Sequence, residues 1–160
     1  MSEIASEWVG CALFITDSLR TQVDRFLRAI EERSRWLAGL TPSSGADDPG
    51  RVWAAERALH VAVECVTDAA NLIIDALVMR DPGGYVDIVR VLMEEGVVSR
   101  DWFQRFEPML RLRERLVHGY LDLPPDEIME AAVQFGPLFN EYVASVRQYL
   151  GIKDLTPPQG

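Results

Sequence analysis

Apolar residues recur along the first quarter of the chain at three- and four-residue steps, with one step of seven. This spacing is the period of one face of an α-helix, so it predicts a long amphipathic helix from about Ser6 to Leu37. The residues that carry the pattern are Trp8, Ala12, Ile15, Leu19, Val23, Phe26, Ile30 and Leu37. Proline, glycine and serine then interrupt it, and residues 41–50 are expected to form a flexible loop within one domain.

The next segment, from about Val52 to Met79, is nearly continuous in Ala, Val, Leu and Ile. It is interrupted by a polar stripe at helical spacing, made of Arg57, His60, Glu64, Asp68, Asn71 and Asp75. A helix that is apolar on all other sides is expected in the middle of a bundle. We interpret the stripe as a polar seam that faces water or another helix, because one histidine and two carboxylates at loose spacing are weak grounds for a metal site.

Two further helices are expected in the middle of the chain. The first runs from Tyr85 to about Glu95 and stops at Gly96. Ser99 has a side chain suited to cap the second, which carries a run of large apolar residues. Pro108 falls inside this second pattern and should kink the helix or start a new one, because proline lacks the N–H that a helix interior uses.

The last expected helix begins near Pro124 and reaches about Leu150, with a kink at Gly136-Pro137 and a loose tail at 154–160. No strand pattern, internal repeat or glycine-rich phosphate loop is found in the sequence. The 160 residues are therefore expected to form a single all-α domain, a bundle of four to five helices.

Composition narrows the possible functions. The net charge of −9 and the pI near 4.7 argue against unspecific coating of nucleic acid, which requires many basic side chains, so any RNA site must be local. Lys153 is the only lysine, and the arginines that dominate suit bidentate phosphate contacts, although a GC-rich genome would give the same bias.

The two cysteines and the N-terminus bear on the compartment. Cys11 and Cys65 lie among apolar residues and far apart in sequence, so they are expected to be reduced core residues. The first residues do not resemble a signal peptide, and no apolar stretch approaches the ~20 residues that span a bilayer. A cytoplasmic protein without membrane segments is expected.

The candidate chemistry lies in the segment RERLVHGY, residues 113–120. His118 can move protons near neutral pH, Arg113 supplies a permanent planar cation, and Tyr120 supplies a hydroxyl. Metal-free RNA cleavage needs an acid, a base and cationic donors for the phosphorane, so His118 fits one of the first two roles and Arg113 the third. Arg111 and Arg115 are candidate substrate-binding residues beside them.

A structural interpretation of the same residues remains open. Gly119 stands where helices commonly close in the left-handed conformation, which puts His118 on the last turn, where it could be only a helix cap. The arginines could form a solvated face paired with acids, and Tyr120 could be half-buried. On a regular helix Arg113 and His118 lie about 140° apart, so they would have to converge through the helix end, side-chain reach or a second subunit.

If RNA is bound, the surface should be locally positive around Arg100, Arg105, Arg111, Arg113 and Arg115.

From about Trp53 to Tyr120 the chain resembles the HepT-like branch of the HEPN superfamily. The similarity is carried by RALHVAVECVTDAANLIIDAL, by YVDIVRVLMEEGVVSRDWFQRF and by the R-x4-H-x-Y motif in RERLVHGY. It implies a HEPN-type bundle in which Arg113 and His118 are the nuclease pair. Glu114 departs from the family, which usually has a small polar residue there; it lies one turn before His118, where its charge would stabilise the imidazolium and repel phosphate.

The resemblance further implies a metal-independent endoribonuclease toxin of a type VII-like HepT/MntA pair, without a cofactor. The family works as a homodimer with two motif copies facing one cleft, which would supply an acid and a base although each chain has one motif histidine. Tyr120 matches the tyrosine that a nucleotidyltransferase antitoxin, MntA-like, modifies with AMP. The alternative is a non-catalytic HEPN-type adaptor that binds such a nucleotidyltransferase.

Overall fold

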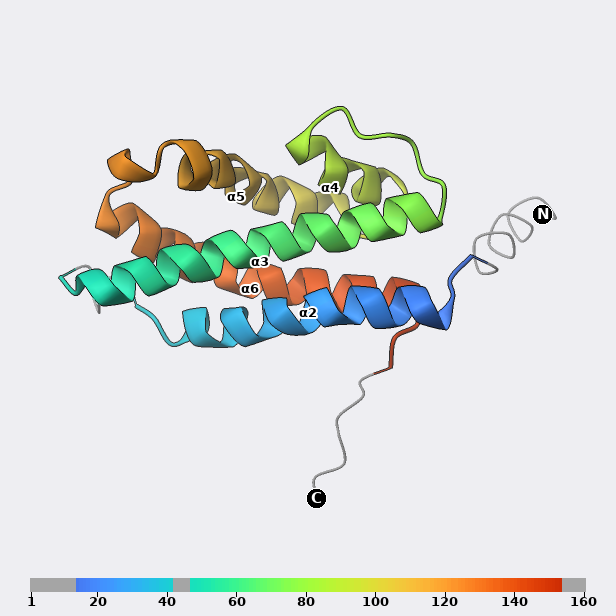
Figure 1. Ribbon diagram of the computed structural model, residues 1–160, viewed down its shortest axis with the longest axis horizontal. Coiled ribbons are helices and arrows are strands. Elements are labelled where there is room, and N and C mark those ends of the chain that lie inside the picture. Colours follow the sequence, from blue (N-terminus) through green and yellow to red (C-terminus); the bar gives the residue numbers. More distant parts are fainter. Residues whose placement is uncertain (1–13, 42–46, 154–160) are drawn as a thin grey trace, which may run out of the picture.

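A computed structural model describes residues 14–41 and 47–153, and in this part of the chain all regular structure is helical (Figure 1). The helices are α2 (Asp17–Ala38), α3 (Pro49–Ala76), α4 (Tyr85–Glu94), α5 (Arg100–His118), the 3-10 turn η1 (Tyr120–Asp122) and α6 (Pro125–Leu150). The all-α bundle of four to five helices is confirmed. No helix in the described ranges is long and apolar enough to cross a membrane.

Helix α2 begins later than the apolar pattern suggested. The hydroxyl of Thr16 accepts a hydrogen bond from the backbone N–H of Leu19 at 3.1 Å, which caps the helix at Asp17. The prediction of one continuous helix from Ser6 is therefore wrong at residues 14–16. The spacing of apolar residues does not reveal a helix cap that lies within the pattern. The part of that prediction before residue 14 lies outside the described residues.

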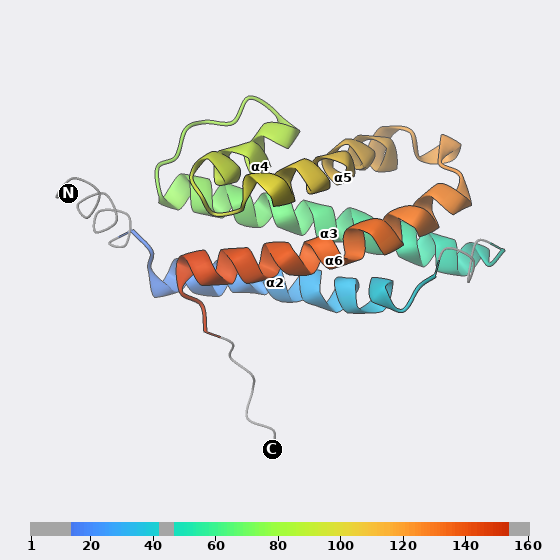
Figure 2. The same ribbon diagram turned by 180° about the vertical axis from the view of Figure 1, so that it is seen from behind.

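Helix α3 is the centre of the bundle, as its nearly continuous apolar sequence predicted. It packs against α2, α4, α5 and α6, and Figures 1 and 2 show it running between α2 on one side and the α4–α5 pair on the other. It begins three residues before Val52, since Asp48 accepts from the N–H of Gly50 at 3.1 Å and Pro49 fits the first turn. The predicted loop 41–50 thus ends at Asp48, and its residues 42–46 lie outside the described part of the chain.

Aromatic side chains join α5 and α6 to α3. The rings of Trp102 and Phe106 stack at 4.6 Å between centroids, and Phe106 meets Phe139 edge to face at 5.2 Å. The fully buried Tyr142 donates its hydroxyl to the carbonyl of Val66 at 2.9 Å. This core aligns α5 along α3 and so fixes where the C-terminal residues of α5 lie.

Both prolines within the long helices are accommodated. Helix α5 continues through Pro108 and α6 through Pro137, so Pro108 does not start a new helix. Tertiary contacts hold the neighbouring turns: the indole N–H of Trp102 donates to the carbonyl of Leu138 at 2.9 Å, and the buried Ser34 hydroxyl donates to the carbonyl next to Pro137 at 2.8 Å. Packing therefore compensates for the helical hydrogen bond that proline removes.

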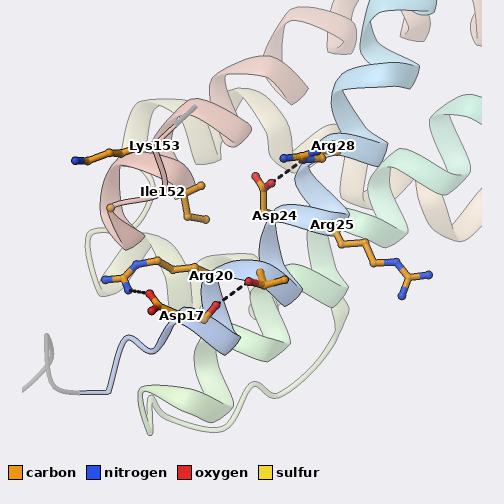
Figure 3. Close-up of a pocket in the computed structure, with 9 residues that line it drawn as sticks. Asp17, Arg20, Asp24, Arg25, Arg28, Ile152 and Lys153 are labelled. Atoms are coloured by element: carbon orange, nitrogen blue, oxygen red, sulfur yellow. Dashed lines mark hydrogen bonds and ion pairs between the residues drawn. The ribbon is translucent and has the colours of Figure 1, made fainter. Parts of the chain in front are cut away.

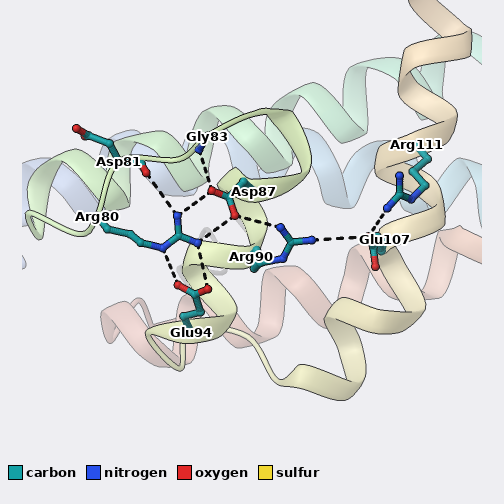
Figure 4. A network of polar contacts seen from close by, with 8 residues as sticks. All are labelled: Arg80, Asp81, Gly83, Asp87, Arg90, Glu94, Glu107 and Arg111. Atoms are coloured by element: carbon teal, nitrogen blue, oxygen red, sulfur yellow. Dashed lines mark hydrogen bonds and ion pairs between the residues drawn. The ribbon is translucent and has the colours of Figure 1, made fainter.

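An ion-pair network fastens the segment after α3 to α4 (Figure 4). The guanidinium of Arg80 lies between Asp87, at 2.8 and 3.0 Å, and Glu94, at 2.7 and 3.1 Å. Asp87 also accepts from the N–H of Gly83 at 2.8 Å and from Arg90 at 3.2 Å. Arg80 and these two donors hold the pKa of Asp87 far below its usual range.

We predict that Asp87→Asn lowers Tm at pH 7 by roughly 2–4 °C, because Arg80 loses its central acceptor. A carboxyl whose pKa is lowered by folding stabilises the protein above its ordinary pKa, and this contribution fades as the pH falls through the lowered value. The Tm difference between the two proteins should therefore shrink below about pH 4. The control is Asp81→Asn, whose side chain points away from the network (Figure 4); equal Tm losses in both variants would contradict the assignment.

The motif lies at the end of the bundle where α3 begins and α6 starts, on the last two turns of α5 and in η1 (Figures 1 and 2). His118 is the last residue of α5, as predicted. Gly119 is not left-handed, with φ of −116°, so that prediction is wrong. The reason is that the chain continues directly into η1, with the N–H of Asp122 donating to the carbonyl of Gly119 at 3.1 Å. Tyr120 and Leu121, which lie in this short turn, are exposed.

Candidate functional site

Arg113 is held against α3 and α4 rather than extended into solvent. Its Nε donates to Oε1 of Glu64 at 2.6 Å, and its guanidinium carbon lies 4.1 Å from the ring centroid of Tyr85. The side chain is 25% exposed. A carboxylate and an aromatic face therefore fix the direction of the cation while part of its donor fork stays accessible.

Three further side chains support this arrangement. The hydroxyl of Tyr85 donates to the same oxygen of Glu64 at 3.3 Å and accepts from Thr67 at 3.2 Å. Nε2 of His60 lies 3.6 Å from that oxygen as well. We call His60, Glu64, Thr67, Tyr85 and Arg113 the Arg113 cluster. It joins α3, α4 and α5.

Two members of the Arg113 cluster, Arg113 and Tyr85, have pKa values raised by their surroundings. The hydrogen bond to Glu64 is the main cause that raises the pKa of Arg113, so the guanidinium remains charged. Burial raises the pKa of Tyr85, which keeps its phenol protonated and able to donate. Arg113 is therefore a fixed cation, paired with the Glu64 carboxylate, rather than a proton-transfer group.

His118 has a different environment. It is exposed, and no residue in the described ranges forms a hydrogen bond with its imidazole. Glu114, one turn earlier, is also exposed and forms no ion pair with it within those ranges. The imidazole of the exposed His118 therefore does not cap the described helix through a hydrogen bond to its last carbonyl groups.

Within one chain, Arg113 and His118 point in different directions. Arg113 faces α3 and α4, whereas His118 lies five residues later, about 140° around the helix axis on the solvent side. No hydrogen bond connects the two side chains in the described structure. A single protomer thus carries both groups near the end of α5, but they face different directions and do not form one site.

The flanking arginines are paired with acids. Arg111 donates to Glu107 at 2.7 Å, and Arg115 forms a two-pronged ion pair with Glu127 at the start of α6. Arg105 pairs with two carboxylates, and Arg113 with Glu64. Four of the five arginines expected to make this surface positive are therefore paired with carboxylates, which reduces the positive charge they can add to it.

Arg111 and Arg115 nevertheless line a groove between α5 and α6, with a volume of about 340 Å³. Glu127, Glu130 and Gln134 lie on its other wall. The groove runs beside the exposed face of α5 that ends at His118. A phosphate that entered it would have to displace a carboxylate from an arginine.

Tyr120 is exposed over 58% of its surface, in η1 directly after the end of α5. The alternative of a half-buried tyrosine is therefore wrong. Its neighbour Leu121 is 86% exposed, so the whole turn projects from the bundle. An enzyme acting on the Tyr120 hydroxyl would reach it without local unfolding.

Neither cysteine nor metal chemistry is suggested by the described residues. Cys65 is buried and reduced, and burial raises the pKa of its thiol, which makes it unreactive. Cys11 lies outside the described ranges. Within those ranges no group of three or more His, Cys, Asp or Glu side chains is arranged to hold a metal ion.

A larger cavity, about 570 Å³, lies at the other end of the bundle, between the start of α2 and the end of α6 (Figure 3). Two of the arginines that line it form ion pairs with aspartates: Arg28 pairs with Asp24 at 2.7 Å, and Arg20 with Asp17 at 2.9 Å. None of the motif residues lines it. The candidate site is therefore the α5 end and not this cavity.

Glu64 and Tyr85 were missed as functional residues by sequence reasoning. Glu64 was assigned to the polar seam of the second helix, but its partner Arg113 is 49 residues away. The only signal was its place in a polar stripe on an otherwise apolar helix. That stripe showed that Glu64 faces something polar without identifying what.

Comparisons with known proteins bear on this arrangement. The family model "Ribonuclease HepT-like" matches residues 26–146. A Bacillus subtilis (strain 168) protein named "Putative RNase YutE" is 31% identical over 97 residues, which cover 61% of this chain and 67% of that protein. The solved structure of B. subtilis YutE, described as a cytosolic protein of unknown function, has a TM-score of 0.74 at 26% identity and covers 82% of this chain and 90% of its own.

A second solved structure, a toxin–antitoxin with AMP-PNP, has a TM-score of 0.69 over 82% of this chain and 99% of its own, at 16% identity, which shows a shared fold. The match of the family model covers well over half of the chain and includes the whole Arg113–Tyr120 segment. The chain therefore belongs to the HepT-like ribonuclease family of the HEPN superfamily.

Proposed function

We propose that this protein is a metal-independent endoribonuclease toxin that cleaves RNA with Arg113 and His118 at a homodimer cleft. The observation that carries the proposal is the contrast between the two residues: Arg113 is oriented by Glu64 and Tyr85, while the His118 imidazole is exposed and unengaged at the helix end. Phosphodiester cleavage by a ribose hydroxyl requires a fixed cation and an available proton carrier, and each chain supplies both, although they face different directions. Membership in the HepT-like ribonuclease family supports it.

The reaction follows from these roles. A His118 imidazole takes the proton of a ribose 2′-hydroxyl, whose oxygen attacks the adjacent phosphorus. The bond from phosphorus to the 5′-oxygen breaks, and the leaving oxygen takes a proton from an imidazolium, so the products are a 2′,3′-cyclic phosphate and a 5′-hydroxyl. Arg113 stabilises the charge of the phosphorane with the terminal nitrogens that Glu64 does not use. Arg111 and Arg115 contact the RNA backbone after exchanging carboxylate partners for phosphates.

A homodimer would complete the site. Each chain carries one motif histidine, whereas the reaction needs a base and an acid, and within one chain Arg113 and His118 point about 140° apart. A two-fold axis at the end of α5 would let two copies of the motif face one cleft.

We therefore predict a dimer of about 36 kDa, twice the mass of the 18.0 kDa chain, in light scattering at micromolar concentration. Crosslinking of cysteines introduced at neighbouring exposed positions of η1 should join the two chains. A monomer would contradict the composite site, as would a dimer whose motifs lie on opposite outer faces.

The activity itself is tested with purified protein and a labelled single-stranded RNA in the presence of EDTA. Cleavage should proceed in EDTA, because Arg113 and His118 supply the charge stabilisation and proton transfer. Loss of cleavage on chelation would contradict the mechanism.

An adaptor role is the second candidate, and the paired arginines favour it. With Arg111, Arg113 and Arg115 neutralised and Glu114 beside His118, the surface attracts RNA weakly. The adaptor would bind a nucleotidyltransferase through the same bundle without cutting RNA. Growth arrest on expression that disappears in His118→Ala would support the toxin, and absence of any arrest would support the adaptor.

We further propose that an MntA-like nucleotidyltransferase antitoxin transfers AMP from ATP to the Tyr120 hydroxyl, releasing pyrophosphate. The exposure of Tyr120 supports this, and a protein of the same fold has been solved as a toxin–antitoxin with an ATP analogue. The added anion would lie two residues from His118 and repel incoming phosphate, so inhibition would need no refolding.

We predict that intact-mass spectrometry of the co-expressed protein shows the added mass of one AMP group. Tyr120→Phe should remain unmodified and should escape neutralisation, since the acceptor oxygen is absent. Tyr149→Phe, on α6, is the matched control and should be neutralised normally. If Tyr120→Phe is neutralised as fully as the parent, control by binding alone replaces this proposal.

A further inference from the structure

A small cavity lies next to the Arg113 cluster, between the first half of α3 and the end of α5. It has a volume of about 250 Å³ and is lined by Trp53, Glu56, Arg57, His60 and Leu116. We call it the Trp53 pocket. His60 connects the two features, because it lines the pocket and lies 3.6 Å from the Glu64 oxygen that binds Arg113.

The Trp53 side chain is mostly exposed and does not belong to the buried core. It is 68% exposed, whereas Trp102, on α5, is 2% exposed and stacks in the core. An exposed indole at the mouth of a cavity offers a large planar surface at little conformational cost. Such a surface is what an unpaired nucleobase stacks on.

Two polar side chains of the pocket, Arg57 and Glu56, have the chemistry to bind the phosphate and the base edge of a nucleotide. Arg57 is exposed and forms no ion pair with any described residue, so its guanidinium is available to a phosphate. The Glu56 carboxylate can accept hydrogen bonds from the exocyclic amino group of adenine, cytosine or guanine, which uracil lacks. A volume of 250 Å³ is below the roughly 300–1,000 Å³ of pockets for drug-sized ligands, which suits one base rather than a larger ligand.

We propose that the Trp53 pocket binds one unpaired, amino-bearing nucleobase of the RNA, stacked on Trp53, with its phosphate at Arg57. The neighbouring nucleotide then lies toward Arg113, so the pocket selects where the chain is cut. This inference rests on the proposed ribonuclease function and adds a base subsite to it.

The test measures binding of a fluorescein-labelled 2′-O-methyl oligoadenylate of six nucleotides to the full-length protein by fluorescence anisotropy. This probe lacks the attacking hydroxyl, so binding is separated from cleavage. Because stacking contributes about 1–3 kcal/mol per base, Trp53→Ala should raise Kd roughly 5- to 150-fold. Trp53→Phe should keep most of the affinity, and oligouridylate should bind the parent more weakly than oligoadenylate.

Trp36→Ala is the matched control, because Trp36 is also exposed, at 43%, but lies on α2 and does not line the pocket. An unchanged Kd in Trp53→Ala would overturn the base subsite. The proposed ribonuclease function would not be affected by that result if cleavage still depended on His118. A shift of Trp53→Ala from dimer to monomer would also overturn it, since Trp53 would then be an interface contact. A parent protein that neither binds nor cleaves RNA would overturn both proposals.

Discussion

Replacing His118 by alanine is expected to slow RNA cleavage roughly 10²- to 10⁴-fold, the usual effect of removing a positioned proton donor or acceptor. The fold should not change, because the imidazole is exposed and makes no hydrogen bond to any described residue. Single-turnover rates on a labelled RNA measure the first effect, and thermal unfolding with light scattering measures the second.

Gln104→Ala is the control for this variant, because Gln104 is exposed on the solvent side of the same helix, about four turns before His118. It should cleave at the parental rate. If His118→Ala also retains the parental rate, the imidazole takes no part in the reaction, and the motif histidine has only a structural role.

Arg113→Ala is expected to reduce cleavage by roughly 10²- to 10³-fold, since it removes the donors that face the developing charge. It should also lower the free energy of unfolding by about 1 kcal/mol, because the partly buried Glu64 and Tyr85 side chains lose their contact with the guanidinium. Arg113→Lys should recover little activity, since a lysine has the charge without the planar fork that reaches Glu64 and a phosphate together. Cleavage rates and urea unfolding curves of the two variants test both effects.

The matched control is Arg105→Ala, on the same helix and paired with Asp101 and Glu141. It removes an arginine from an ion pair outside the Arg113 cluster, so its cleavage rate should not change. Equal activity losses at Arg105 and Arg113 would indicate a general effect of positive charge on RNA binding and would remove the special role of Arg113.

The helices could be predicted because their signals are local. Periodic apolar residues, the Ser99 cap and the glycine and proline breaks are readable within a few residues, and the central place of α3 followed from its apolar character on nearly all sides. The start of α2 was missed since the apolar pattern runs across the Thr16 cap without a break. The left-handed conformation predicted for Gly119 was wrong because the chain turns into η1 directly after this residue.

The site was predictable only as a set of residue types. Spacing and the family resemblance selected Arg113, His118 and Tyr120, and the exposure of the last two agrees with the roles proposed for them. The contact between Glu64 and Arg113, like that between Glu127 and Arg115, joins different helices. Such contacts depend on how the helices pack, which periodicity within one helix does not determine.

The ends of the RNA products test the proposed mechanism most directly. In EDTA the parent protein is expected to produce fragments with a 2′,3′-cyclic phosphate and a 5′-hydroxyl, and to leave the same RNA intact when its riboses are 2′-O-methylated. The same fragments should form roughly 10²- to 10⁴-fold more slowly in His118→Ala. Fragments with 5′-phosphates that form only with added metal would contradict the account, and so would cleavage that persists undiminished without His118.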